Sequence, residues 1–536
     1  MKSNAIFLIV SLVLGAVFFQ HCQSTDNEPQ KVDPTFVITG INPETGTAGT
    51  AVVIAGTGFS ATATDNLVTL NGKACVVTVA TAEQLTITIP PDAGTGKIKV
   101  ALNGKEAESN VFTYTTSSAS SACALDVSFD ADGSVATDIA AGEPGSFRFV
   151  NSNAIQPDGK ILVIGESIQA NGDRPFVVLR YNADGSPDNS WGGDGQVLTG
   201  LPADYDYANA KAIVVQPDNK VVVVGEVKYG NASDMMIVRY QTDGTLDNSF
   251  DGDGILVHAP SVPDYSTSAA LGVALQSDNK IVVAGVYQQY NLKAQAAVLR
   301  LLPNGSPDNT FDSDGRKDLN FGDTETSNVL NDVKLQPDGK IVVSGSAETN
   351  FVSVFALARL TTNGALDAAF GAGGSGKQTT KIFTTENRSY SSLIQPDGKI
   401  LLAGYIRGDG SVSSIGAMVR YNADGSKDES FGSFGHVGYI TDVTIGVIQD
   451  FVRMNDGKLI ICAGWYVARL NANGTPDNSF CDGNYIFKIA DKNASLQTLS
   501  LQTDNALVAS GLHLREEADG KRYYTYYTAR YMNAKN

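Results

Sequence analysis

An arginine that is followed eight residues later by an aspartate recurs along this chain. A guanidinium group and a carboxylate at this spacing can form a charge-assisted, bidentate ion pair. Because a motif present once in every repeat cannot be a single catalytic centre, we interpret the pairs as internal contacts that brace a turn. The alternative is a ring of ligand-binding arginines. The pairs are Arg180 and Asp188, Arg239 and Asp247, Arg300 and Asp308, Arg359 and Asp367, Arg420 and Asp428, and Arg469 and Asp477.

Few other residues are suited to catalysis. The histidines after the N-terminal segment, His258, His436 and His513, stand in different repeats with no partner pattern. Glu166 and Glu226 occupy equivalent positions in consecutive repeats, and such a pair of carboxylates can serve as the acid and base of a glycosidase. Two exposed acids at blade ends also occur readily by chance. We therefore name only these two glutamates as weak catalytic candidates.

The arginine pairs belong to a longer pattern that occurs seven times. Each copy opens with a Gln-Pro-Asp-Gly-Lys turn or a variant of it, at residues 156, 216, 276, 336, 395, 454 and 502. Each copy then carries four strand-like segments, which in the fourth copy are 331–336, 341–344, 354–360 and a segment after Phe370. Runs such as 161–164 are apolar at consecutive positions, so protein should cover both faces of that strand. The pattern predicts a four-stranded antiparallel sheet repeated seven times, as in the blades of a β-propeller.

The first and last copies are incomplete in complementary ways. Arg530 in the seventh copy has only six residues after it, whereas an Asp-x-x-Phe step stands ahead of the first copy, at Asp126 to Phe129. We expect this N-terminal segment to supply the outer strand of the seventh blade and to pair Asp126 with Arg530. The ring then has no free strand edges. One aromatic residue per repeat should pack between blades: Phe129, Trp191, Phe250, Phe311, Phe370, Phe431 and Phe480.

Residues 34–116 predict a separate β-sandwich. Short segments rich in Val, Ile and Thr alternate there with Gly and Pro turns. The segment resembles the IPT/TIG family of Ig-like domains, and that resemblance implies a spacer or binding module without catalytic residues. Residues 117–123 are expected to form a linker. The residues that carry the resemblance are Ile41-Asn-Pro43, Gly46, Gly49-Thr50, Val53-Ile54, Gly56, Gly58-Phe59, Val68, Pro90 and Phe112-Thr-Tyr114.

The repeats of residues 125–536 resemble the delta-60 repeat family through its consensus Leu-Gln-Pro-Asp-Gly-Lys-Ile, Leu-Arg-Tyr, Asp-Gly-Ser and Asp-x-Ser-Phe-Gly. The resemblance brings no established activity and implies a secreted or surface protein of bacteria. The predicted fold class is therefore all-β: an Ig-like β-sandwich, followed over residues 124–536 by a seven-bladed β-propeller that an N-terminal outer strand closes.

The N-terminus carries a targeting signal. Residues 1–22 resemble a lipoprotein-type signal peptide, with an apolar run from Ile6 to Phe19 and then Cys22 at the position that is cleaved and acylated in bacterial lipoproteins. Residues 23–33 are polar and predict a tether. We expect an exported protein, lipid-attached at Cys22 to the outer membrane or cell surface; the alternative is a secreted or periplasmic protein. The lipid anchor is the only membrane contact expected.

Charge and cysteine content restrict the partners. The net charge of −18 disfavours nucleic acid and anionic membrane surfaces. The cysteines at 75, 123, 462 and 481 form no CxxC pair, so they predict neither a zinc site nor a disulfide framework. Cys123 and Cys481 would lie in neighbouring blades and one bridge is conceivable, but we favour isolated buried thiols. We expect a monomer with no metal site and no cofactor.

The uniform hairpin turns should lie on one face of the propeller, and the variable loops on the opposite face. Variable loops on a rigid scaffold are where binding sites are built, and we call this the variable-loop face. Its aromatic residues are Tyr205, Tyr207, Tyr229, Tyr287, Tyr290, Tyr405, Trp465, Tyr523 and Tyr524. These side chains suit a ligand, or they simply cover the blade ends.

The predicted function is a non-enzymatic cell-surface binding or adhesion scaffold that recognises a glycan or a surface protein on this face. Two alternatives stay open. One is a carbohydrate-active hydrolase or lyase with acidic residues on the same face, and the other is a purely architectural envelope protein.

Overall fold

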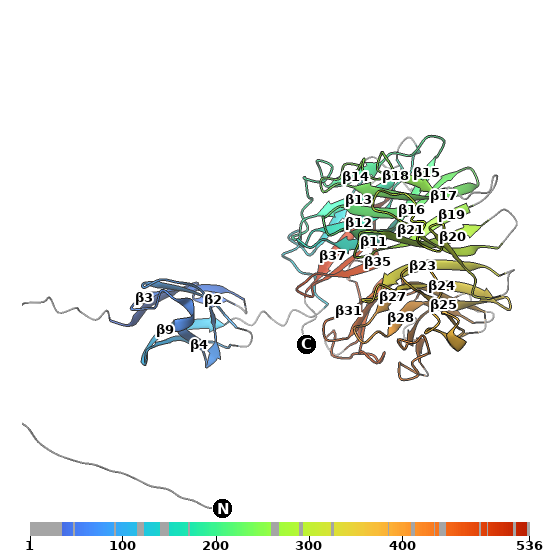
Figure 1. Cartoon of the computed structure of the whole chain (residues 1–536). Helices are drawn as coiled ribbons and strands as arrows, with labels where there is room; N and C mark the ends of the chain where they lie inside the picture. The colour runs from blue at the N-terminus through green and yellow to red at the C-terminus, as the bar shows by residue number, and fades with distance from the viewer. Residues whose placement is uncertain are drawn as a thin grey trace, which may run out of the picture. The chain divides into compact units, whose positions relative to one another are not determined.

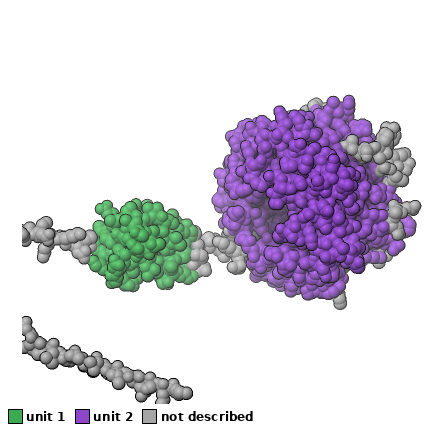
Figure 2. All heavy atoms as spheres, viewed as in Figure 1, with its two compact units in different colours: residues 1–119 green, residues 120–536 purple. Residues whose placement is uncertain are grey.

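The computed structural model of the protein describes residues 35–46, 49–90, 93–114, 123–139, 149–169, 172–258, 267–288, 293–322, 326–383, 385–408, 413–433, 435–438, 446–481, 484–489, 491, 493–517 and 521–532. The chain divides into two compact units, residues 1–119 and 120–536 (Figure 2). The predicted signal peptide, the tether and Cys22 lie outside the described residues. No helix within the described ranges is long and apolar enough to cross a membrane.

The first unit consists of two sheets. One has the strand order β1 (Val37–Asn42), β3 (Ala51–Thr57), β7 (Gln84–Thr88) and β6 (Val76–Ala80). The other has the order β2 (Thr45–Gly46), β9 (Lys105–Tyr114), β8 (Gly96–Leu102), β4 (Leu67–Leu70) and β5 (Lys73–Ala74). Alternate residues of the strands are buried, as expected where one face of a sheet meets the core. Val52, Ile87 and Phe112 form part of that core.

The second unit contains seven four-stranded antiparallel blades (Figure 1). The strands of blades 1 to 3 are β11 (Phe149–Ile155), β12 (Ile161–Glu166), β13 (Phe176–Tyr181) and β14 (Gln196–Thr199); β15 (Tyr207–Val215), β16 (Val221–Tyr229), β17 (Ala232–Tyr240) and β18 (Ile255–His258); and β19 (Thr267–Leu275), β20 (Ile281–Gln288), β21 (Gln295–Leu301) and β22 (Arg316–Leu319). Blades 2 and 3 are also joined by one parallel pair, Ser233 with Thr267.

The remaining blades follow the same order. Their strands are β23 (Asn328–Leu335), β24 (Ile341–Thr349), β25 (Val352–Leu360) and β26 (Lys377–Thr380); β27 (Glu386–Ile394), β28 (Ile400–Arg407), β29 (Ile415–Tyr421) and β30 (His436–Gly438); β31 (Asp450–Arg453), β32 (Leu459–Ala463), β33 (Tyr466–Leu470) and β34 (Ile486–Lys488); and β35 (Ala494–Leu501), β36 (Leu507–Glu516), β37 (Arg522–Tyr531) and β10 (Ser134–Thr137). The predicted all-β fold class, a sandwich followed by a propeller, is confirmed.

The N-terminal segment of this unit completes the seventh blade. Strand β10 pairs with β37, from Ser134 opposite Ala529 to Thr137 opposite Tyr526. Consecutive blades bury apolar side chains between them, and the repeated aromatic residues are all buried. Every residue of β12 and β13 is buried, which explains why these strands read as continuous apolar runs.

A disulfide reinforces this closure. Cys123, just ahead of the closing segment, is bonded to Cys481 beyond β33 of blade 6, with a Cα–Cα distance of 5.7 Å. Our preference for isolated thiols was therefore wrong for this pair, because ring closure brings together two residues that are 358 positions apart in the sequence. Cys75 and Cys462 are free and buried.

The innermost strands carry a bulge at a fixed position. The register of β11, β15, β19, β23, β27 and β35 skips one residue, and a bulged residue leaves the hydrogen-bond ladder and re-aims its side chain. In blade 6, Gln449 holds the corresponding position just before β31. All seven of these residues line one cavity of about 500 Å³, which we call the central cavity: Asn151, Lys211, Leu271, Asn331, Tyr390, Gln449 and Gln497.

Candidate functional site

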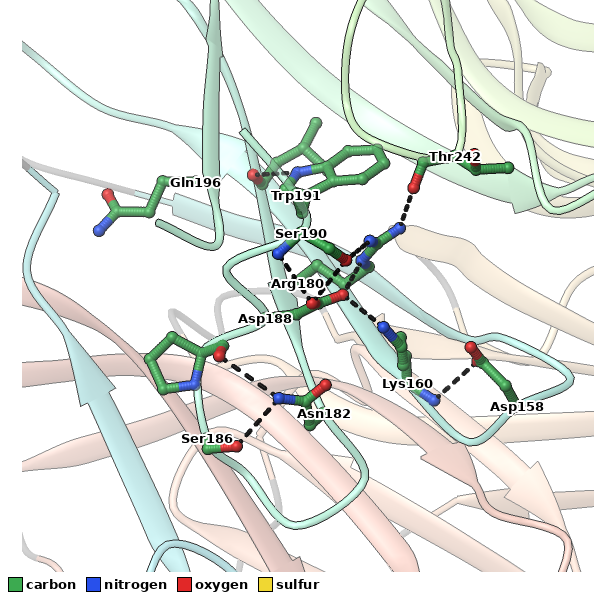
Figure 3. Close-up of polar contacts among 12 residues, drawn as sticks. Asp158, Lys160, Arg180, Asn182, Ser186, Asp188, Ser190, Trp191, Gln196 and Thr242 are labelled. Carbon is green, nitrogen blue, oxygen red and sulfur yellow. Dashed lines mark hydrogen bonds and ion pairs between the residues drawn. The ribbon is translucent and has the colours of Figure 1, made fainter. Parts of the chain in front are cut away.

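The arginine and aspartate pairs form the most regular polar sites of the propeller (Figure 3). In blade 1, Arg180 Nε donates to Asp188 Oδ2 at 2.6 Å, and Lys160 Nζ donates to the same oxygen at 2.7 Å. Burial alone would raise the pKa of Asp188, but the hydrogen bonds from Lys160 and Ser190 and the charge of Arg180 bring it well below its usual value. The Arg180 guanidinium lies 4.6 Å from the centroid of the Trp191 ring.

Six of the arginines also reach the neighbouring blade. Arg180 Nη1 donates to the carbonyl of Thr242, which precedes the Asp-Gly turn of blade 2 (Figure 3). Equivalent bonds run from Arg239, Arg300, Arg359, Arg420 and Arg530 to the carbonyls of Pro303, Thr362, Ala423, Ala472 and Ala183. All seven ion pairs have N–O distances of 2.6 to 2.9 Å. The arginines therefore join blades, which sequence reasoning did not foresee.

Glu166 and Glu226 are placed differently from the prediction. The two glutamates were expected to be exposed, but Glu166 is only 2% exposed and the Glu226 side chain 13%. Lys228 Nζ lies 3.3 Å from Glu226 Oε1, and Lys211 Nζ lies 3.8 Å from the same atom. The prediction of two exposed acids is wrong, because the packing of blade 1 against blade 2 surrounds both carboxylates with cations.

Glu166 still carries an unusual feature. Its Oε2 atom is buried and has no hydrogen-bond partner among the described residues. Burial raises the pKa of the Glu166 carboxyl, against a hydrogen bond with Tyr207 and the positive charges of Lys211 and Arg174. The Tyr207 ring itself lies 5.3 Å from the Arg174 guanidinium and 5.0 Å from Lys228 Nζ. Tyr207 is therefore part of this internal cluster.

The other predicted aromatic residues are scattered. Trp465 and Tyr229 are 51% and 48% exposed, whereas Tyr287 and Tyr405 are buried, so the last two cover blade ends and offer no open surface. Tyr205 lies edge-on against Tyr229.

The remaining members of that set are not grouped either. Tyr523 and Tyr524 are half-buried on β37, where the Arg515 guanidinium lies 5.5 Å from the Tyr523 ring. Tyr290 lies outside the described residues. The predicted aromatic residues do not converge on one site.

A groove between blades 4 and 5 has the features of a binding site. It has a volume of about 570 Å³, within the usual range for ligand pockets. We call it the blade 4–5 groove. Its lining residues come from the start of β23, the β24–β25 hairpin and the adjoining ends of β27 and β28: Ser327, Val329, Asn331, Ser346, Ala347, Glu348, Phe351, Ser353, Thr385, Glu386, Arg388, Tyr390, Arg407 and Gly408.

Phe351 stands at the tip of one wall of this groove. It is 94% exposed, the most exposed large apolar side chain among the described residues. Thr349 pairs with Val352, so Asn350 and Phe351 form a two-residue hairpin loop with φ angles of 48° and 62°. A positive φ is unfavourable for an aromatic residue, and glycine or asparagine normally takes this position. The turn thus keeps an apolar ring in water at a conformational cost, which is expected where a function retains it.

The opposite wall is a rigid polar network around Glu386. Glu386 Oε1 lies 2.8 Å from Arg388 Nε and accepts from the Tyr405 hydroxyl at 2.8 Å, and Oε2 lies 3.0 Å from Arg407 Nη1. Burial, followed by the hydrogen bond to Glu386, raises the pKa of the Tyr405 hydroxyl. Tyr390 and Tyr405 lie with their ring centroids 5.8 Å apart. Because two cations share one carboxylate, this wall has an excess of positive charge.

The groove combines an exposed aromatic ring with charged and hydroxyl groups. An exposed ring faces a wall of guanidinium, carboxylate and phenol groups whose side chains hold one another in place. Glu386, the carboxylate of this wall, is held by three donors and is not available as a base. No group of three or more metal-ligating side chains exists in the part of the chain that the structure describes.

The sequence analysis named Tyr405 in this region, which is buried, and named neither Phe351 nor Tyr390. Two signals pointed to the groove. Phe351 is an aromatic residue in a hairpin loop, and Tyr390 replaces the Asn, Lys, Leu or Gln found at the same position of the other repeats.

Comparisons with known proteins agree with the architecture. Residues 36–117 match the IPT/TIG domain, and residues 156–190, 216–250, 276–311, 336–370, 395–431 and 455–480 match a domain of unknown function (DUF5122) described as a beta-propeller. No curated protein matches the chain.

Several solved structures show a low similarity to this chain. A protein of unknown function from Bacteroides thetaiotaomicron is 13% identical, with a TM-score of 0.32, and the match covers 94% of this chain and 99% of that one. An auxiliary nutrient binding protein from the same organism is 12% identical, with a TM-score of 0.30 and coverage of 92% and 98%. A polysaccharide lyase, Uly1, is 9% identical, with a TM-score of 0.42 and coverage of 74% and 91%. At these scores the similarities say nothing about the ligand or activity of this chain.

Proposed function

We propose that this protein, which joins an IPT/TIG domain to a β-propeller of DUF5122 repeats, is an exported, non-enzymatic binding protein that holds a glycan in the blade 4–5 groove. The observation that carries the proposal is the position of Phe351. A fully exposed aromatic ring, kept at a positive φ, lines the same groove as Tyr390, Arg388 and Arg407.

The chemistry of the groove fits a sugar. The ring of Phe351 can cover the apolar face of a pyranose, while the guanidinium and hydroxyl groups across the groove satisfy its hydroxyl groups. A flat protein surface would need a larger apolar patch than one ring provides. We therefore favour a glycan over a protein partner.

Two observations support export. The N-terminal 22 residues have the composition of a lipoprotein-type signal peptide, and the propeller carries the Cys123–Cys481 disulfide. Disulfides persist in oxidising compartments outside the cytosol. In this proposal the lipid on Cys22 holds the chain at a membrane surface, and the blade 4–5 groove lies on the variable-loop face.

The proposal is tested on a glycan array with the secreted form that begins at residue 23. We expect binding by the wild type and by Trp465→Ala, whose ring is exposed but does not line the groove, and loss of binding in Phe351→Ala. Binding that disappears only in Trp465→Ala would place the site elsewhere on the propeller.

The same samples separate the enzymatic alternative. The bound glycans are incubated with the wild type and with a Glu166→Gln/Glu226→Gln variant, and the products are analysed by mass spectrometry. No cleavage is expected. Cleavage that the double variant abolishes would make the protein a carbohydrate-active enzyme. An array without any binding would favour a protein partner or an architectural role.

A further inference from the structure

The blade 4–5 groove and the central cavity of the propeller are neighbours. Two residues, Asn331 and Tyr390, line both hollows. They are the bulged residues of β23 and β27, and a bulge turns its residue out of the strand ladder. A ligand that lies in the groove beside Tyr390 is therefore adjacent to a second hollow of about 500 Å³.

The bulge level of the central cavity is suited to hydroxyl groups. Four of its seven bulge-position residues are carboxamides, Asn151, Asn331, Gln449 and Gln497, and a carboxamide both donates and accepts hydrogen bonds. Their orientation is partly fixed by contacts to the next blade. Asn331 Nδ2 donates to the Ser389 carbonyl at 2.6 Å.

Asn151 and Gln497 make corresponding contacts. Asn151 Nδ2 donates to the Ala210 carbonyl at 2.6 Å, and Gln497 Oε1 accepts from the Val150 amide at 3.2 Å. Each of these bonds engages either the amide nitrogen or the carbonyl oxygen of the carboxamide, but not both. The side chain of Gln449 is exposed, and it makes no side-chain hydrogen bond among the described residues. The ring thus offers fixed polar atoms around the cavity.

The part of the cavity beyond the bulge level has a mixed lining, which includes the ion pair of Lys334 with Asp332 at 2.8 Å. Leu335 and Ile394, the last residues of β23 and β27 before the uniform turns, line it together with Ile213, Phe451 and Leu499. The seven innermost strands enclose this space on all sides, so a polymer lying along the groove can place only an end in it.

We propose that the protein binds glycans by a chain end: the terminal sugar occupies the central cavity beside Asn331, Tyr390 and Gln449, and a sugar several units further along the chain stacks on Phe351. This inference rests on the proposed glycan-binding function and adds to it the selection of chain ends over internal segments.

The test uses the secreted form that begins at residue 23, on the glycan array described above. Gln449→Ala removes a side chain that lines the central cavity and does not line the groove. We expect this variant to weaken binding about tenfold, the loss of roughly one ligand hydrogen bond. The control is Gln196→Ala, on the outer strand β14 of blade 1, which should bind like the wild type.

A competition experiment examines the chain end directly. For the array glycan that binds best, longer and shorter chains of the same polymer compete for the protein at equal mass. We expect potency to fall in proportion to chain length, because the number of ends falls in that proportion.

The outcomes separate the two proposals. Binding that needs Phe351 but is unchanged in Gln449→Ala, with potency independent of chain length, overturns chain-end recognition and leaves the groove as the site. Absence of all glycan binding overturns both.

Discussion

Arg530 and Asp126 are separated by 404 positions in the sequence, yet Arg530 Nε donates to Asp126 Oδ2 at 2.9 Å. The contact is the seventh copy of the pair formed by Arg180 and Asp188, in this case across the point where the ring closes. Arg530 Nη1 also donates to the carbonyl of Ala183, so blade 7 is tied to blade 1 as blades 1 to 5 are each tied to the next. The ring is therefore closed by the same arginine–aspartate ion pair, with its hydrogen bond to the next blade, that occurs within the propeller.

Removal of the contact between Arg530 and Asp126 should destabilise the propeller. In Asp126→Ala the guanidinium of Arg530 loses its carboxylate in a partly buried position, and we expect the free energy of unfolding to fall by about 1 to 3 kcal/mol. Urea denaturation measures the change. The control is Asp138→Ala, because the Asp138 and Arg515 side chains are 43% and 46% exposed and such a pair contributes at most about 1 kcal/mol. An equal fall in the free energy of unfolding in the two variants would contradict a structural role for the Arg530–Asp126 contact.

The Cys123–Cys481 disulfide should add to the same closure. A Cys123→Ser/Cys481→Ser variant frees the segment that delivers β10, and we expect a loss of about 2 to 4 kcal/mol in the free energy of unfolding. Thermal denaturation with and without a reducing agent checks this. The wild type should be sensitive to the reducing agent and the double variant should not. Peptide mapping under non-reducing conditions identifies the bond itself, and two free thiols in the exported protein would disprove it.

Phe351 should favour binding at the expense of stability. Phe351→Gly relieves the positive φ of the turn, so we expect it to raise the free energy of unfolding by about 1 kcal/mol while glycan binding is lost. Phe351→Ala keeps the unfavourable backbone and should lose binding without that gain. Denaturant midpoints and array binding of the two variants give the comparison. A glycine variant that is less stable than the wild type would show that the ring supports the fold.

Acid should weaken the propeller through its repeated aspartates. Burial alone would raise the pKa of Asp247, but hydrogen bonds from Lys220 and Ser249 and the charge of Arg239 lower it to about 2. In the unfolded chain the pKa of an aspartate is about 3.9, so near and below that pH the unfolded state binds more protons than the folded state. Stability contributed by this carboxylate is therefore fully present above about pH 4 and is lost as the pH falls toward 2. Urea midpoints at decreasing pH should drop in this window, and Asp247→Asn should show a smaller drop than the wild type.

Much of the fold could be predicted because the sequence pattern of one blade occurs seven times. A turn signature, an apolar strand and an arginine with its aspartate each have a meaning that depends on neighbours within one blade, and their periodicity fixes the blade number. The incomplete first and last copies also predicted the closing strand, which the pairing of β10 with β37 confirms.

The candidate site was harder to predict because it is made of the exceptions to the repeat. Phe351 and Tyr390 stand on different blades, and nothing in either local sequence says that they line one groove. Glu166 and Glu226 looked equivalent by position, but Glu166 is nearly inaccessible because residues of blade 2 cover it. In each case the decisive neighbour comes from another blade.

The sequence by itself therefore determined the two-part all-β architecture, the seven blades, the closing strand and the pairing of each repeated arginine with its aspartate, since these follow from short-range patterns that recur. Only the tertiary structure decided the disulfide, the burial of the two glutamates and the position of the groove beside the central cavity. These depend on how side chains of adjacent blades pack against one another, which is a property of the assembled ring and has no counterpart in any single repeat.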